Sequence, residues 1–288
     1  MKSEFLKTAV LLLATGLRLP AAPDPSWIEP FPPHKIADNL YYVGSKALAS
    51  FLVTTPKGLI LINSSLVPSV PLLEKSVQQL GFRFEDIKIL LISHAHYDHC
   101  AGSDLIKRKT RAAYMVMDAD VSLVEDGGKS DFQYGGNPDF QFPPTKVDRI
   151  LHDGDTVQLG GVVLTAHLTP GHTKGCTTWT MQVTQGGKRY NVVIVGSPNV
   201  NSGYKLVNNS LYPNIAQDYA KCFRGLASLP CDIFLGAHGE YYGLEEKYPK
   251  LATGSPNPFI DPQGYVSYVA ERKAAFEAEL AKQSATQR

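Results

Sequence analysis

Residues 86–102 read DIKILLISHAHYDHCAG, in which a short apolar run ends in three histidines and an aspartate. The apolar run is suited to a central β-strand that is buried on both faces. His94, His96, Asp98 and His99 then follow within six residues, and no regular strand or helix can turn all four side chains to one face. The segment must therefore fold as a loop around a group that offsets the desolvation of these side chains, and a divalent metal ion does so.

Two more histidines stand at the ends of apolar runs. His172 follows VVLTAHL in a Pro-Gly-His turn, and His238 comes directly after DIFLGA. Sheets of α/β proteins build their sites at strand ends, so we expect both side chains to join the same metal site. His34, His152 and His167 lack this context, and we interpret them as structural or solvated residues.

The length and charge of the chain exclude some classes of protein. Its 288 residues suffice for one large domain or two small ones, and the 28 basic residues nearly balance the 27 acidic ones. No block of like charges is present, so we expect no nucleic-acid partner and no membrane-surface partner. No linker divides the sequence, and we therefore expect one domain over residues 23–288.

The first 22 residues are typical of a secretory signal peptide. Lys2 and Lys7 flank the start, an apolar run follows, and small residues then lead to Ala21 and Ala22, where cleavage is expected. The apolar run is too short to serve as a membrane anchor. This interpretation places the mature protein in the periplasm or outside the cell; a frayed N-terminal helix is the alternative.

The four cysteines form no C-x-x-C pair, which argues against a zinc ribbon or a thioredoxin-type site. In an oxidising compartment Cys222–Cys231 is the favoured disulfide, because the two residues are close in sequence. Buried free thiols are an equal alternative.

Strand patterns and helix patterns alternate along the chain. Strands followed by helices, twice over, predict an α/β fold in which two β-sheets pack face to face with helices outside. Residues 149–172 and 176–197 are predicted to be strand pairs with Asp-Gly and Gly-Gly turns. Residues 129–149, aromatic yet rich in Gly and Pro, are predicted to form a long surface loop that flanks the site.

The segments HAHYDHCAG, TPGHTKGCTTW and GAH, in this order, resemble the metallo-β-lactamase superfamily. The resemblance extends from about Leu40 to Phe259. It implies an αβ/βα four-layer sandwich, with two packed mixed β-sheets and helices on the outer faces, that carries a dinuclear zinc site. The first segment is typical of the superfamily as a whole and not of one reaction within it.

The segment VGSPNV indicates which subclass of the superfamily the chain resembles. It has Ser197 where many superfamily hydrolases have a metal-bridging aspartate and two β-lactamase subclasses have cysteine. Serine at this position, together with His99, resembles the third subclass of class B β-lactamases. The resemblance implies zinc-dependent hydrolysis of β-lactam antibiotics, carbapenems among them. We expect the protein to act on this small-molecule substrate as a monomer.

Carried over residue by residue, the resemblance assigns the metal ligands and the substrate contacts. It implies a first zinc ion held by His94, His96 and His172, and a second held by Asp98, His99 and His238. Asp98 would also orient the attacking hydroxide. Ser197 and Asn199 match positions that hydrogen-bond the substrate carboxylate, although an ordinary polar turn explains them nearly as well.

The sequence departs from the superfamily pattern at one position near the site, and two other functions are possible for the chain. Asn63 stands where the superfamily usually has an aspartate, and we expect this to weaken zinc retention because an amide adds no negative charge. The same fold and metals could instead serve a lactone or thioester hydrolase, although the missing bridging carboxylate argues against it. A non-catalytic zinc-stabilised protein is the third possibility, although structural zinc sites are usually mononuclear and closed.

Overall fold

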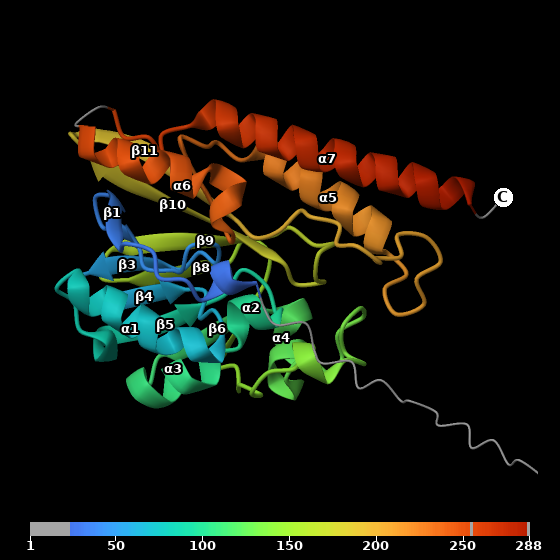
Figure 1. Ribbon diagram of the computed structural model, residues 1–288, viewed down its shortest axis with the longest axis horizontal. Helices are drawn as coiled ribbons and strands as arrows, with labels where there is room; N and C mark the ends of the chain where they lie inside the picture. The colour runs from blue at the N-terminus through green and yellow to red at the C-terminus, as the bar shows by residue number, and fades with distance from the viewer. Residues whose placement is uncertain (1–23, 254–255, 287–288) are drawn as a thin grey trace, which may run out of the picture.

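Two β-sheets pack face to face, and helices cover their outer sides (Figure 1). The computed structural model describes residues 24–253 and 256–286. The predicted α/β sandwich of two mixed sheets is therefore confirmed. The predicted signal peptide, residues 1–22, lies outside the described residues.

The first sheet has seven strands, in the same order in space as in the sequence. The strands are β1 His34–Ala37, β2 Leu40–Tyr42, β3 Phe51–Thr55, β4 Gly58–Ile62, β5 Ile87–Leu91, β6 Ala113–Met117 and β7 Arg149–Leu151. Pairing is antiparallel from β1 to β4 and parallel from β4 to β7. The buried strand predicted before the histidine cluster is β5, which has parallel neighbours on both sides.

The second sheet has five strands in the order β12-β11-β10-β9-β8. The strands are β8 Thr156–Leu159, β9 Val162–Leu168, β10 Thr177–Gln185, β11 Lys188–Val195 and β12 Ile233–Gly236. Only the β11–β12 pair is parallel. The two Gly-Gly turns join β8 to β9 and β10 to β11. All four of these glycines have positive φ, as two-residue hairpin turns require.

One predicted pairing is wrong. The strand before Asp153-Gly154, β7, does not pair with β8. It pairs with β6, with Arg149 opposite Met115. The chain therefore crosses from the first sheet to the second near the Asp-Gly turn. The sequence signal for a turn is the same in a hairpin and in a crossover.

The helices lie on the two outer faces of the sandwich. They are α1 Val70–Gln79, α2 Tyr97–Cys100, α3 Ser103–Thr110, α4 Asp118–Asp126, α5 Ile215–Ser228, α6 Leu244–Lys247 and α7 Pro262–Ala285. In Figure 1, α1 and α3 flank the first sheet, whereas α5 and α7 run over the second. No helix within the described ranges is both long and apolar enough to cross a bilayer.

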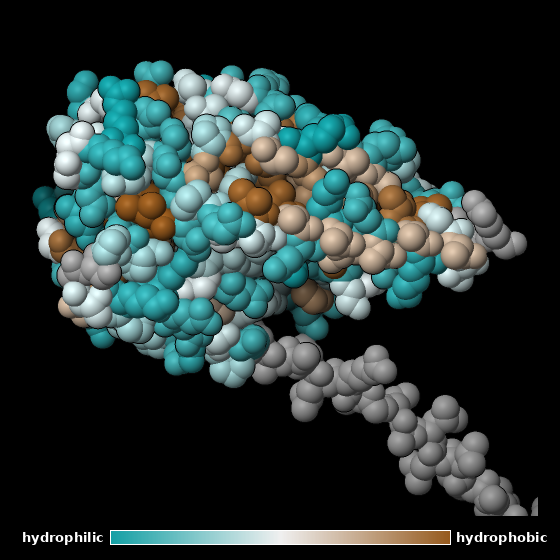
Figure 2. Space-filling view, turned by 90° about the horizontal axis from the view of Figure 1, so that it is seen from above, coloured by the Kyte–Doolittle hydropathy of each residue, from teal (hydrophilic) through white to brown (hydrophobic). Residues whose placement is uncertain are grey.

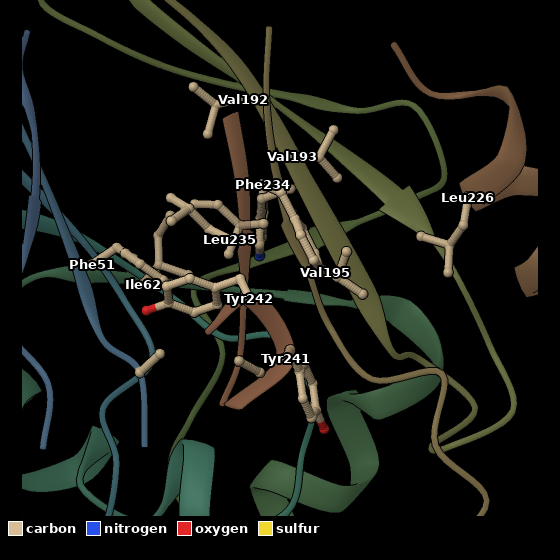
Figure 3. Packing of buried hydrophobic residues seen from close by; sticks show 14 of the residues in the cluster. Phe51, Ile62, Val192, Val193, Val195, Leu226, Phe234, Leu235, Tyr241 and Tyr242 are labelled. Atoms are coloured by element: carbon tan, nitrogen blue, oxygen red, sulfur yellow. The ribbon is translucent and has the colours of Figure 1, made fainter. Parts of the chain in front are cut away.

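The interior between the sheets is apolar. Figure 3 shows Phe51 and Ile62 of the first sheet near Phe234 and Leu235 of β12, and all four side chains are at most 1% exposed. Each fully buried side chain of this size stabilises the fold by about 1.5–3 kcal/mol relative to an exposed one. This packing fixes the two sheets against each other, so the loops at their shared edge are held in place.

Helices α5 and α7 close the second sheet from outside. The Tyr265 hydroxyl donates to the Leu226 carbonyl oxygen over 2.6 Å, and the rings of Tyr219 and Phe276 stack at 5.2 Å. The groove between the two helices is lined mostly by apolar side chains, and Val266, one of its lining residues, is 58% exposed. Figure 2 shows hydrophobic side chains at the surface over these helices.

All four cysteines are free thiols, so the predicted Cys222–Cys231 disulfide is wrong and the alternative of free thiols applies. Cys222 is buried on α5, whereas Cys231 precedes β12 and is only half-buried. Nearness in sequence did not bring the two thiols together, because Cys222 lies on α5 whereas Cys231 lies in the connection between α5 and β12.

Candidate metal centre

The predicted metal ligands lie on three segments that meet at one edge of the sandwich. His94, His96, Asp98 and His99 occupy the connection after β5, where the short helix α2 begins behind His96. His172 lies in the turn between β9 and β10, and His238 follows β12. The structure thus brings all six predicted side chains together.

The first three side chains form one group. His96 Nδ1 lies 3.1 Å from His172 Nε2. The ring of His94 packs against both, with centroid distances of 4.8 Å to His96 and 4.6 Å to His172. One nitrogen from each of these residues lies within 4.8 Å of the others, and all three residues are buried.

The second three side chains form an adjoining group. Asp98 Oδ2 lies 3.1 Å from His99 Nε2 and 3.5 Å from His238 Nε2. The two imidazole nitrogens are 3.1 Å apart. The ring of His94 lies 4.3 Å from that of His99, so the two groups are contiguous.

The donor atoms fit a metal site. Both nitrogens of His94 are buried and lack a hydrogen-bond partner within the described chain, and so does His99 Nδ1. Buried polar atoms in proteins are normally paired, and unpaired nitrogens that point into a cluster of imidazoles are typical of metal ligands. Five imidazoles and one carboxylate are a nitrogen and oxygen donor set that suits zinc.

The electrostatics favour the ligating protonation states. Burial, followed by the neighbouring imidazoles, lowers the pKa of His94 and His172, and burial lowers the pKa of His238 to about 4. Burial opposes ionisation of Asp98, but His99 and His238 together outweigh it and lower the pKa of this carboxyl group. At neutral pH the imidazoles of His94, His172 and His238 are therefore neutral and Asp98 is ionised, which are the forms that bind metal.

A buried carboxylate fixes two of the ligand segments to each other. Asp120, at the start of α4, accepts hydrogen bonds from the backbone N–H of Ala95 (2.9 Å) and of Gly175 (2.8 Å) and from the Thr173 hydroxyl (2.7 Å). A Cβ atom at position 175 would lie 2.6 Å from Asp120 N, so the approach requires glycine. Asp120 thus connects the His94–His99 segment to the turn that carries His172.

His172 is oriented from its other side. Its Nδ1 lies 2.8 Å from the carbonyl oxygen of Asn199, which also accepts from the Tyr219 hydroxyl at 2.7 Å. The Tyr204 hydroxyl donates to the His172 carbonyl oxygen. An imidazole that donates from Nδ1 has its lone pair on Nε2, the nitrogen that faces His96.

A cavity opens beside the two groups, and its wall is largely aromatic. Its aromatic lining residues other than histidine are Trp27, Tyr97, Tyr134, Phe140, Phe142 and Tyr241. Three of them come from the loop over 129–149, so its predicted place beside the site is confirmed. Trp27 comes from the segment before β1, and its ring lies 6.5 Å from that of His238.

The two predicted substrate contacts differ in position. Asn199 lines the cavity, whereas Ser197 is 1% exposed and is not part of the lining. Tyr241 connects them, because its hydroxyl lies 3.1 Å from Ser197 Oγ and accepts from Asn199 Nδ2 at 2.9 Å. Tyr241 itself faces the cavity.

The remaining histidines lie outside the cluster, as predicted. His34 stacks on Tyr42 in the core, and His167 Nε2 lies 2.8 Å from the Thr180 hydroxyl. His152 is exposed beside Asp118.

Sequence reasoning missed three residues at the site: Asp120, Asp131 and Tyr241. Asp131, from the long loop, lies with Oδ2 3.5 Å from His96 Nε2. No local signal marks these residues, because an aspartate near a helix start or in a polar loop is usually solvated. Their roles depend on which groups the tertiary fold places opposite them.

Comparison with known proteins agrees with this geometry. The sequence profile described as the metallo-beta-lactamase superfamily matches residues 48–238. The native FEZ-1 metallo-beta-lactamase from Legionella gormanii is 56% identical, with a TM-score of 0.88, over 89% of this chain and 98% of that chain. BJP-1, a subclass B3 metallo-beta-lactamase of Bradyrhizobium japonicum, is 38% identical, with a TM-score of 0.86, over 92% of this chain and 99% of that chain.

A curated relative matches over a shorter segment. A probable metallo-hydrolase of Burkholderia pseudomallei is 34% identical over 103 residues, which are 36% of this chain and 33% of that protein. The chain thus matches about a third of this relative, but nearly the whole length of the two solved structures. With its profile match, its fold and its similarity to a subclass B3 enzyme, the chain belongs to the metallo-beta-lactamase superfamily and resembles the third subclass of its class B enzymes.

Proposed function

We propose that the protein is a dizinc β-lactamase that opens the β-lactam ring of antibiotics, carbapenems among them, and so confers resistance. The observation that carries the proposal is the convergence of six side chains that could ligate metal beside an aromatic cavity. Similarity to FEZ-1 and BJP-1, both named metallo-beta-lactamases, supports the choice of substrate. Ser197, in place of a bridging carboxylate, favours this substrate over lactones and thioesters.

The two groups of ligands would hold the two metal ions. His94, His96 and His172 would bind one zinc ion, and Asp98, His99 and His238 the other. The chemistry that bound zinc supplies is Lewis acidity, which lowers the pKa of water to near neutrality and polarises a carbonyl group. Asp98 is ionised, so its carboxylate can accept a hydrogen bond from the attacking water and orient it toward the lactam carbonyl carbon.

The rest of the cavity would position the substrate. The substrate carboxylate would be bound at the end of the cavity near Asn199 and Ser197, directly or through water, with the Tyr241 hydroxyl between them. The aromatic wall would pack against the substituents of the bicyclic core and exclude water. We further propose that residues 23–288 act as one domain and as a monomer, in the periplasm or outside the cell, after removal of residues 1–22.

The test is hydrolysis of a chromogenic cephalosporin by the zinc-loaded protein, with and without a chelator. We expect ring opening that the chelator abolishes and added zinc restores. The variant His94→Ala should lose this activity, whereas His152→Ala, which removes an exposed imidazole, should keep it. Hydrolysis of lactones or thioesters alone would support the alternative substrate class, and an inert zinc-loaded protein would exclude catalysis.

A further inference from the structure

Asp131, in the loop over 129–149, is a buried carboxylate with two separate tasks. Its Oδ1 accepts hydrogen bonds from the backbone N–H groups of Gln133 (2.7 Å) and Tyr134 (2.6 Å). Its Oδ2 lies 3.5 Å from His96 Nε2. The residue is only 8% exposed, so water does not replace either contact freely.

The second contact joins two atoms that have no other partner. Asp131 Oδ2 and His96 Nε2 are both buried, and neither has a hydrogen-bond partner elsewhere in the described chain. Their separation exceeds that of a strong hydrogen bond. Since buried polar atoms are almost always paired, an imidazole N–H and a carboxylate oxygen that face each other in isolation are natural partners.

The position of His96 decides which of its nitrogens carries the proton. Its Nδ1 lies 3.1 Å from His172 Nε2, inside the cluster of ligands. A neutral imidazole has one N–H group and one lone pair, so ligation through Nδ1 leaves the proton on Nε2. Asp131 places a carboxylate oxygen 3.5 Å from that nitrogen.

We propose that Asp131 is a positioning residue for the metal centre: it accepts a hydrogen bond from His96 Nε2–H, fixes the tautomer that ligates through Nδ1 and aligns the ring. This inference rests on the metal centre of the proposed function. A carboxylate behind a ligating histidine also raises the basicity of the ligand, and loss of such a partner commonly weakens metal binding 10- to 100-fold.

The same carboxylate couples the metal ligand to the cavity wall. Tyr134, whose N–H donates to Asp131, packs edge-on against the His96 ring at 5.3 Å and stacks on Phe140 at 4.6 Å. Both aromatic rings line the cavity. Asp131 therefore sets the place of this wall relative to His96.

The variant Asp131→Asn separates the two tasks. Its amide oxygen can still accept from Gln133 and Tyr134, whereas its NH2 group would face the Nε2 proton of His96. Asp139→Asn is the matched control, because it removes the same charge from an exposed position of the same loop. Competition with a chromophoric chelator should show one zinc ion bound 10- to 100-fold more weakly in Asp131→Asn and unchanged affinities in Asp139→Asn.

A second measurement determines directly which nitrogen of His96 carries the proton. In the zinc-loaded wild-type protein with 15N-labelled histidine, NMR should show His96 protonated at Nε2, with a slowly exchanging proton. In Asp131→Asn, if folded, this proton should exchange faster. A proton on Nδ1 in the wild type, or equal zinc affinities for the folded Asp131→Asn and the wild type, would overturn the inference while leaving the proposed β-lactamase intact. A wild-type protein that binds no zinc would overturn both.

Discussion

At the scale of single residues, Asn63 shows how one substitution adjusts the surroundings of a metal site. It follows β4 with φ of 67°, a left-handed conformation that asparagine tolerates better than most residues. Its side-chain oxygen accepts from the Ser93 N–H at 2.8 Å, and its NH2 group donates to the Ala49 carbonyl at 3.1 Å. The amide satisfies one donor and one acceptor, whereas a carboxylate could satisfy only the donor.

Asn63→Asp should therefore have opposite effects on metal binding and on the stability of the metal-free protein. The side chain at position 63 accepts from the N–H of Ser93, the residue before His94, so the new negative charge would lie close to the metal site. We therefore expect tighter zinc retention in chelator competition. The second carboxylate oxygen would replace the NH2 group that donates to the Ala49 carbonyl, so two acceptors would face each other without a hydrogen bond. This loss should lower the free energy of unfolding of the metal-free protein by about 1–3 kcal/mol. Equal zinc affinities in the two proteins would refute the expected role of position 63.

Residue identity alone predicts the ligands but not the groups that orient them. His94, His172 and His238 are predictable because each follows an apolar run, and strand ends converge in such folds. Asp120 and Asp131 are not, because the donors that they meet come from segments far away in sequence. Their contacts exist only once the two sheets have packed.

At the scale of elements, the end of α7 supports a loop beside the site. Gln283 accepts from the Leu206 N–H at 2.7 Å and donates to the Tyr204 carbonyl at 2.8 Å. The Tyr204 hydroxyl in turn donates to the backbone of His172. A charged amphipathic helix is predictable at this place, but the part that its last turn takes in bracing the loop is not.

Gln283→Ala should loosen this loop without unfolding the protein. The substitution leaves the Leu206 N–H and the Tyr204 carbonyl without their partner, and such a loss is worth about 1–3 kcal/mol. We expect the Leu206 amide hydrogen to exchange about 10- to 100-fold faster, since it would open locally. The neighbouring Lys282→Ala, which alters an exposed side chain, is the control, and equal exchange of Leu206 in both variants would contradict the bracing role.

At the scale of the whole molecule, the two-sheet sandwich is predictable because strand and helix patterns alternate twice along the chain. Membership of each strand is harder to predict: β7 lies in the first sheet although the turn after it resembles a hairpin. His34, which opens β1, stacks on Tyr42 of β2 and on Phe259 near the C-terminal helix, so it connects distant parts of the chain.

This buried imidazole should make global stability depend on pH. Burial lowers the pKa of His34 to about 4 from an ordinary value of 6.5, against the opposing hydrogen bond to Pro32. Between these values the unfolded chain binds a proton that the folded protein excludes, so stability falls as pH falls. From pH 7 to pH 5 the loss from this group is about 2 kcal/mol.

The variant His34→Phe isolates that contribution, because a phenyl ring keeps the stacking and cannot titrate. His34 Nε2 is buried without a partner in the described chain, so the variant loses only the contact of Nδ1 with the Pro32 carbonyl oxygen. In urea unfolding of the metal-free proteins, the stability of the variant relative to the wild type should rise by about 2 kcal/mol from pH 7 to pH 5. The imidazoles of the metal centre titrate equally in both proteins and cancel. A stability difference that is the same at both pH values would show that His34 is protonated equally in the folded and unfolded chains.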